Sequence, residues 1–283
     1  MLKNTFCHLN GLGMRYEKRL WSDGIFTWDA LLDKGHASVK KEPSIAEEIR
    51  HSVRRLSESD HKYFVKNLPV NQHWRMFSAF RKQIAYLDIE TNGFMGEQGY
   101  ITTISLYDGA NVHYYVSGKN LRDFKRDIEK YKLIVTYNGK CFDVPFIEKE
   151  FDIKMEHAHI DLRFVLRELG FMGGLKACEK ELGIDREELA GVDGYFAVLL
   201  WNEFKRHKNV KALETLLAYN IQDVVNMEPL MILAYNHKLA TTPFQRTHKV
   251  VQWPSPTLPF SADVPTIRKI FSENSRHFPA GVV

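Results

Sequence analysis

The sequence predicts an α/β fold: a mixed β-sheet with flanking helices, preceded by a small helical N-terminal region. Two observations support this prediction. Strand-like segments between residues 84 and 162 first follow one another in hairpin succession and then alternate with helical segments, which is typical of a mixed sheet covered by helices. The 283 residues are 44% hydrophobic and 26% charged, an ordinary globular mix with enough apolar material for a sizeable core.

Residues 1–80 are expected to be mostly helical, with a solvated helix over 40–56 and a short helix over 73–80. The segment LNGLGM at 9–14 has the pattern of a helix-hairpin-helix, in which Gly11 and Gly13 let backbone amides approach a phosphate. Arg15 and Lys18 lie where further phosphate contacts are expected. The alternative is a plain turn that joins two helices.

The central part, residues 81–240, supplies the sheet. Three strands come first, at 84–89 (IAYLDI), 101–107 (ITTISLY) and 112–116 (VHYYV), followed by a helix at 121–131, a strand at 133–137, a helix at 144–151 and a strand at 159–162. The dipeptide Asp108-Gly109 is typical of a hairpin turn. Residues 164–239 are expected to be helical with glycine breaks. Residues 241–283, which contain six of the ten prolines, are expected to form an extended basic tail on the body of the protein or to be partly disordered.

Charge and composition exclude some classes of protein. The net charge is +4 over residues 1–80, −3 over 81–240 and +3 over 241–283, so basic ends flank an acidic centre. This division suits a polyanion ligand and a cation site, and the alternative is a random scatter of charge. No apolar run is long enough to span a membrane, and no signal-peptide segment is present, so a cytoplasmic protein without membrane contact is expected. Three cysteines cannot form a disulfide framework.

Three short motifs carry acidic residues. Asp88 and Glu90 are two residues apart on a strand, so their carboxylates share one face. Their repulsion and desolvation destabilise the fold unless a cation compensates. The alternative is that the strand ends at Asp88 and that both acids are solvated. Asp143 follows an Asn-Gly turn after a buried strand and either caps the next helix or points at a site above the strand end. Tyr219 and Asp223 are four apart and share a helix face beside apolar positions.

In this order the motifs resemble those of the DEDD exonuclease superfamily, which has a ribonuclease-H-like fold. The segment TYNGKCFDVPFI at 136–147 is similar to the second exonuclease motif of family B polymerase proofreading domains. Tyr219 stands four residues before the last acid, and Ala218 stands where the other branch has histidine, which is typical of the DEDDy branch. The resemblance covers residues 81–238 and is strongest to the YprB-type ribonuclease-H-like domain.

The resemblance implies a 3′→5′ exonuclease that uses two Mg²⁺ or Mn²⁺ ions and releases nucleoside 5′-monophosphates. It implies that Asp88, Glu90 and Asp143 hold one metal, that Asp88 bridges to a second, and that Asp223 completes the first site. Carboxylates are hard oxygen donors, which select Mg²⁺ or Mn²⁺ over Zn²⁺. Tyr219 would orient the attacking water, because its reference pKa of about 10 disfavours action as a free base.

The same resemblance implies a nucleic-acid substrate with a free 3′ end, with single-stranded DNA and a repair role favoured. Whether a helicase is a partner is left open by the sequence. Substrate contacts are expected in five residues: Thr91, Asn92, Asn138, Lys140 and Phe142. Each of three residues has a structural alternative: Asn138 could form the left-handed turn, Phe142 could pack in the core, and Lys140 could be a solvated surface residue. A ribonuclease-H-like endonuclease, a ribonuclease and a non-catalytic nucleic-acid-binding subunit that recruits a helicase remain open as alternatives.

Overall fold

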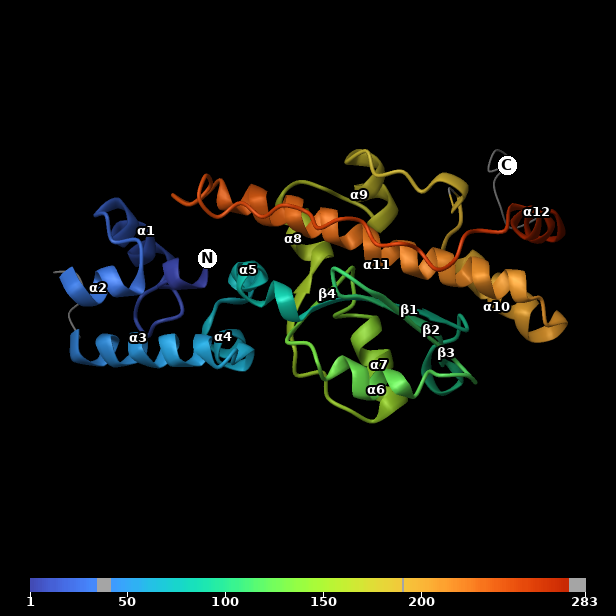
Figure 1. Ribbon diagram of the computed structural model, residues 1–283, viewed down its shortest axis with the longest axis horizontal. Coiled ribbons are helices and arrows are strands. Elements are labelled where there is room, and N and C mark those ends of the chain that lie inside the picture. The colour runs from blue at the N-terminus through green and yellow to red at the C-terminus, as the bar shows by residue number, and fades with distance from the viewer. Residues whose placement is uncertain (35–41, 190, 275–283) are drawn as a thin grey trace.

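The structure is a computed structural model that describes residues 1–34, 42–189 and 191–274 (Figure 1). Within these residues a single mixed sheet has the strand order β3-β2-β1-β4-β5. The strands are β1 (Ile84–Thr91), β2 (Ile101–Tyr107), β3 (Val112–Val116), β4 (Leu133–Thr136) and β5 (Ala158–Asp161). β2 pairs antiparallel with β1 and β3, whereas β4 is parallel to β1 and β5. The predicted fold class is confirmed.

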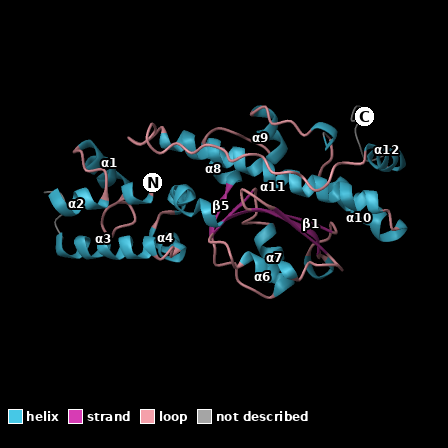
Figure 2. Cartoon of the chain, viewed as in Figure 1, coloured by secondary structure: helices cyan, strands magenta, loops and turns pink. Residues whose placement is uncertain are grey.

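Helices cover both faces of the sheet (Figure 2). On one face lie α6 (Asp123–Ile128) and α7 (Asp143–Phe151). The long helix α11 (Val210–Leu239) crosses the other face and packs with α8 (Leu162–Glu168), α9 (Leu175–Glu181) and α10 (Gly194–His207). Among the described residues, no helix combines the length and the apolar content that crossing a membrane requires.

The alternation of side chains along β1 decides which of them meet α11. Ala85, Leu87 and Ile89 belong to the apolar cluster under α6 and α7. Ile84 and Tyr86 belong to the cluster shared with α11. Because successive side chains of a strand point to opposite faces, the acids at positions 88 and 90 face α11 as well.

The N-terminal region is helical, as predicted. It consists of the 3-10 helix η1 (Leu2–Asn4), α1 (Met14–Ser22), α2 (Trp28–Lys34), α3 (Glu42–Ser57), α4 (His61–Asn67), the 3-10 helix η2 (Val70–Met76), α5 (Phe77–Phe80) and the 3-10 helix η3 (Arg81–Gln83). The helix expected over 73–80 is therefore a 3-10 helix up to Met76. The expected helix over 40–56 is α3, and the first two residues of that prediction lie outside the described residues.

The glycine segment does not form the expected helix-hairpin-helix. Only the three-residue η1 and turns precede Gly11, and α1 begins at Met14. The reason lies in Glu17, whose carboxylate accepts hydrogen bonds from the amides of Phe6 and Cys7 at 2.7 and 3.1 Å. These bonds fold the preceding chain across α1 instead of leaving it to form a helix of its own.

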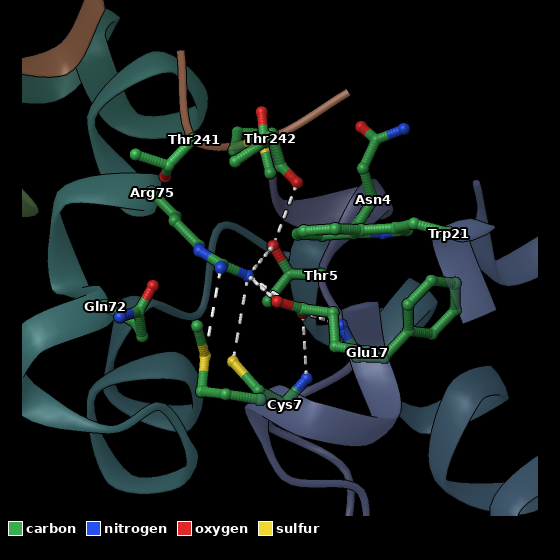
Figure 3. Close-up of polar contacts among 12 residues, drawn as sticks. Asn4, Thr5, Cys7, Glu17, Trp21, Gln72, Arg75, Thr241 and Thr242 are labelled. Carbon is green, nitrogen blue, oxygen red and sulfur yellow. Dashed lines mark hydrogen bonds and ion pairs between the residues drawn. The ribbon is translucent and has the colours of Figure 1, made fainter. Parts of the chain in front are cut away.

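A buried ion pair joins η2 to α1 (Figure 3). The guanidinium of Arg75 lies 2.8 Å from the carboxylate of Glu17, and neither side chain is more than 2% exposed. Arg75 also donates to Thr5 at 3.3 Å and lies over the ring of Trp21. Buried charges require such partners, so this contact fixes the position of η2 relative to α1.

The C-terminal segment is only partly the extended tail that was expected. Residues 249–263 have no regular secondary structure and run alongside α11 (Figure 1). They end in α12 (Val264–Glu273), a helix that was not predicted from the sequence. The side chain of Asp263 caps this helix by accepting from the amide of Thr266 at 3.0 Å, and Pro265 occupies its first turn, where proline is tolerated.

Candidate active site

β1 presents two acidic side chains to α11. Asp88 and Glu90 are half-buried and pair through their backbones with Ser105 and Thr103 of β2. The register shifts directly after Glu90, so the two carboxylates stand where regular pairing of β1 with β2 ends. A regular central strand therefore holds the two carboxylates near its C-terminal end.

α11 brings the third acid to the same place. Tyr219 and Asp223 are both buried and lie one helical turn apart. Carboxylate oxygens of Asp88, Glu90 and Asp223 all lie within 4.8 Å of one another. Three carboxylates at this separation repel one another unless a cation or protons compensate, and oxygen-only donors suit a divalent cation such as Mg²⁺.

Asp143 lies beside this cluster and not within it. It is the first residue of α7, but the N-cap position belongs to Phe142, and among the described residues no side chain caps the helix. Its carboxylate accepts from the amide of Ile89 at 3.1 Å. A cavity of about 570 Å³ is lined by all five residues of the three motifs, Asp88, Glu90, Asp143, Tyr219 and Asp223. We call it the acid cavity. The structure thus brings the five predicted residues together, with three of the four acids in one ligand cluster.

Burial and mutual repulsion raise the pKa values of these acids. The pKa of Asp88 is well above its ordinary value because burial disfavours the charged form and the neighbouring carboxylates, Asp223 first, add to this effect. The pKa of Glu90 is raised in the same way. Burial raises the pKa of Asp143 to about 7, although the hydrogen bond from Ile89 stabilises its charged form. Without a cation, the acid cavity therefore holds protons that ordinary carboxyl groups release well below pH 7.

Asn220 positions Asp88 and was not predicted from the sequence. Its amide nitrogen donates to the carboxylate of Asp88 at 2.6 Å, and its amide oxygen accepts from Thr103 and Ser105 at 3.1 and 2.8 Å. The two hydroxyl donors of β2 thereby fix the orientation of the amide. Asn220 stands between the Tyr and the Asp of the third motif, but nothing in that spacing indicates a partner on β2.

Two cations that were likewise not predicted contact residues of the third motif. Lys176 of α9 donates to the hydroxyl of Tyr219 at 2.9 Å and to the carbonyl of Val192. Burial lowers the pKa of Lys176, although the nearby Asp223 favours its charged form. Burial and the same carboxylate raise the pKa of Tyr219 well above 10, so its hydroxyl keeps its proton at neutral pH.

Arg186 is the second cation. It is hydrogen-bonded to Asp223 and forms two further bonds to Glu179, at 2.5 and 2.7 Å. Asn226 of α11 donates to the same Glu179 at 2.9 Å. Burial nevertheless keeps the pKa of Asp223 above its ordinary value, because the desolvation of the carboxylate outweighs the attraction of Arg186. This network ties α9 and the loop after it to α11 beside the acid cavity.

The residues predicted to contact substrate fall into two groups. Thr91 and Phe142 line the acid cavity, and Phe142 also packs on the core through Phe146. Asn92 does not line the cavity, because its side chain closes the loop that contains the 3-10 helix η4 (Gly96–Gln98): it donates to the carbonyl of Gln98 and accepts from the amide of Tyr100.

The turn after β4 has the conformation that its Asn-Gly sequence predicts. Asn138 has a φ of +66°, in the left-handed region, and lines the acid cavity. Its side-chain oxygen accepts from Arg163 at 2.5 Å. Lys140 is exposed and lines a neighbouring concavity instead. The four N-terminal residues predicted to bind phosphate are exposed and do not line the acid cavity: Gly11, Gly13, Arg15 and Lys18.

The chain is similar to known proteins in structure and in sequence. A family B DNA polymerase from the hyperthermophilic archaeon Pyrobaculum calidifontis is similar in structure, with 17% sequence identity and a TM-score of 0.41, over 56% of this chain and 24% of the polymerase. The matched region is thus about a quarter of the polymerase. The comparison with curated proteins found no match. The model of the RNase_H superfamily matches residues 85–235, more than half of the chain. The chain therefore belongs to the RNase_H superfamily.

Proposed function

We propose that the protein is a metal-dependent 3′→5′ exonuclease that hydrolyses phosphodiester bonds of DNA and releases nucleoside 5′-monophosphates. The observation that carries this proposal is the convergence of Asp88, Glu90 and Asp223 within 4.8 Å in the cavity that Asp143 and Tyr219 also line. Membership of a superfamily whose members are typically nucleases supports the reaction class. The order and spacing of the acids along the chain support the exonuclease assignment.

The donor set fits Mg²⁺ or Mn²⁺. Asp88, Glu90 and Asp223 would hold the ion directly, with Asp143 at the adjoining wall of the cavity. Oxygen-only donors with raised pKa values are chemically suited to a hard divalent cation, because its charge relieves the repulsion that now favours protonation. When two such ions are bound, they supply activation of the attacking water and stabilisation of the leaving oxygen.

Tyr219 acts as a hydrogen-bond donor in this proposal and not as a base. Its hydroxyl keeps its proton at neutral pH and receives a hydrogen bond from Lys176 at 2.9 Å. Its remaining role is to orient a water molecule or a phosphate oxygen over the acids. Asn220 holds the carboxylate of Asp88 in place, and the amide of Ile89 holds that of Asp143.

The test is hydrolysis of 5′-end-labelled single-stranded DNA by the full chain with Mg²⁺ or Mn²⁺. We expect a ladder of shortened labelled products together with unlabelled mononucleotides. Asp88→Asn should abolish cleavage, and a circular single strand should resist it. Cleavage of the circle would instead indicate an endonuclease, and preferential cleavage of RNA a ribonuclease. Failure of the folded protein on DNA and RNA with both metals overturns the proposal.

A further inference from the structure

Two more concavities adjoin the acid cavity on the side of the Asn138 turn. The first, of about 570 Å³, shares Tyr137, Asn138, Gly174 and Leu175 with the acid cavity. The second, of about 400 Å³, shares Arg167 with the first. The three therefore adjoin one another along the surface. We call the two outer concavities together the basic groove.

Cations line the basic groove. Arg163 and Arg167 lie one turn apart on α8, and Lys140 follows the Asn138 turn; all three are exposed. In the described part of the chain, no carboxylate forms an ion pair with any of these three side chains. Lys238 of α11, at the far end, is paired with Glu168 at 2.5 Å. The groove therefore presents at least three positive groups to a ligand.

The buried carboxylate of the groove does not cancel this charge. Asp161 is 2% exposed and accepts hydrogen bonds from the backbone amides of Asn138, Lys140 and Arg163, at 2.8, 3.1 and 3.1 Å. Its oxygens are thus occupied by the turn and by the start of α8. The same bonds hold the turn that joins the groove to the acid cavity.

Apolar side chains alternate with these cations. Phe164 and Phe171 are half-buried in the lining, and Met172 is 65% exposed beside them. A positively charged groove with interspersed aromatic side chains is the surface on which single strands bind, because the cations contact phosphates and the rings contact bases. This pattern favours a single strand as the occupant.

The part of the acid cavity that is not shared with the groove has a different character. Phe94, Met95 and Tyr195 line it with exposed fractions of 58%, 71% and 47%. These side chains are suited to a terminal base and offer no positive charge to a continuing phosphate chain. This contrast favours the basic groove as the path of a strand that ends in the acid cavity.

We propose that the basic groove binds the single-stranded DNA that lies on the 5′ side of the 3′ end. Arg167 and Lys140 contact its phosphates, and Phe164 and Phe171 contact its bases. The direction of the strand rests on the proposed exonuclease function, whereas binding in the groove does not require cleavage. The two can therefore be tested separately.

The experiment measures the binding of fluorescein-labelled oligothymidylates of about 4 to 16 nucleotides, with phosphorothioate linkages that resist hydrolysis, to the full chain. Fluorescence anisotropy gives Kd at several salt concentrations. We expect Arg167→Ala with Lys140→Ala to raise Kd severalfold for long oligonucleotides and to remove most of the gain in affinity with length. For each phosphate that is no longer neutralised by a cation, the slope of log K against log salt should fall by about 0.7.

Arg126→Ala is the matched control, because Arg126 is an exposed arginine of α6 on the other face of the sheet. Arg167→Gln, which keeps a long polar side chain without the charge, serves as a second variant. If both groove variants bind as the control does, or if the wild type binds no oligonucleotide, the groove proposal is overturned. If binding depends on Arg167 but unmodified DNA is never cleaved, the groove stands and the exonuclease proposal fails.

Discussion

The carboxylate of Asp88 is held in a place where its charge costs stability. Its pKa is raised by burial and by neighbouring acids. Asp88→Asn keeps the shape and can still accept the hydrogen bond from Asn220. In EDTA we expect this variant to melt a few degrees above the wild type, since about 1 kcal/mol corresponds to about 2–4 °C for a protein near this size. Differential scanning calorimetry gives the comparison.

The matched control for Asp88→Asn is Asp127→Asn. The pKa of Asp127 is lowered to about 2, chiefly by its hydrogen bond with Lys130, so loss of its charge should not stabilise the protein. Addition of Mg²⁺ should raise the melting temperature of the wild type and leave that of Asp88→Asn nearly unchanged, because a ligand stabilises only the state that binds it. An Asp88→Asn variant that melts at or below the wild type in EDTA would contradict a repulsive acid cluster.

The raised pKa of Asp143 predicts a particular pH dependence in the absence of metal. Between its ordinary pKa of 3.8 and the folded value of about 7, the folded state binds more protons at this group than the unfolded state does. The contribution of Asp143 to the free energy of unfolding therefore falls as pH rises through this window. In thermal melts in EDTA, the melting temperature should fall less between pH 4 and pH 7 for Asp143→Asn than for the wild type. If the melting temperatures of the two proteins change with pH in parallel, Asp143 does not titrate in this window.

Asn220 is expected to control the affinity for metal through Asp88. In Asn220→Ala the carboxylate loses its donor, and Thr103 and Ser105 of β2 lose their acceptor. Loss of a group that orients a metal ligand typically costs about 10–100-fold in metal affinity or activity. We expect the Mn²⁺ dissociation constant from calorimetry to rise by this order. Lys211→Ala, at the exposed start of the same helix, should leave it unchanged, and an unaltered constant in Asn220→Ala would refute the positioning role.

The site was predictable from the sequence where its residues lie in local motifs. Asp88 with Glu90, and Tyr219 with Asp223, share a face because of the two-residue period of a strand and the four-residue spacing of a helix. Arg186 contacts Asp223, which is 37 residues away in the sequence, and no local sequence pattern predicts a contact at that separation. The same holds for Lys176 and Asn220, whose partners are set by the packing of α9 and α11 on the sheet.

At the scale of elements, strands were predicted more accurately than helix ends. The predicted limits of β2 and β3 match the structure because runs of β-branched and aromatic residues stop at an Asp-Gly turn. α12 was missed, although Asp263 before Val264-Pro265 is a helix-start signal. The many prolines around this helix led instead to the prediction of an extended tail. The segment before α1 was misjudged because the hydrogen bonds of Glu17 reach back to Phe6 and Cys7.

The contact between η2 and α1 depends on the Arg75–Glu17 pair. Arg75→Met would leave the carboxylate of Glu17 buried without its cation. Removal of one partner from a buried pair costs about 3–5 kcal/mol, so urea unfolding should show a loss of this size. Arg19→Met, which breaks an exposed pair with Asp23, should cost less than about 1 kcal/mol. Equal losses in the two variants would mean that the buried pair adds no particular stability.

At the scale of the whole molecule, charge is divided between centre and flanks. The net −3 of residues 81–240 includes the acids that surround the cavity, whereas residues 1–80 and 241–283 carry +4 and +3. Two bound divalent ions would reverse the sign of the centre. Long-range attraction of a polyanion would then depend on metal as well as on the basic ends.

The C-terminal segment fastens the N-terminal region to the sheet. Phe244 packs edge-on against Trp21 of α1 at 5.4 Å between ring centres. Trp253 lies under the guanidinium of Arg81, 3.9 Å from it, and against Gly109 in the turn between β2 and β3. These contacts connect the two ends of the chain with its centre, so loosening the segment should affect the whole molecule.

Gly109→Ala tests this fastening. A Cβ at Gly109 would lie 1.8 Å from Trp253, so the indole must move. Gly118→Ala is the matched control, because Gly118 also has a positive φ, +77° against +92°, but no heavy atom of the described residues lies within 4 Å of the added Cβ. Both variants should lose about 1–2 kcal/mol from the left-handed backbone. Only Gly109→Ala should lose more stability than this. It alone should also change tryptophan fluorescence and increase trypsin cleavage after Arg246 and Lys249. Equal trypsin cleavage in the two variants would show that Trp253 does not hold the segment in place.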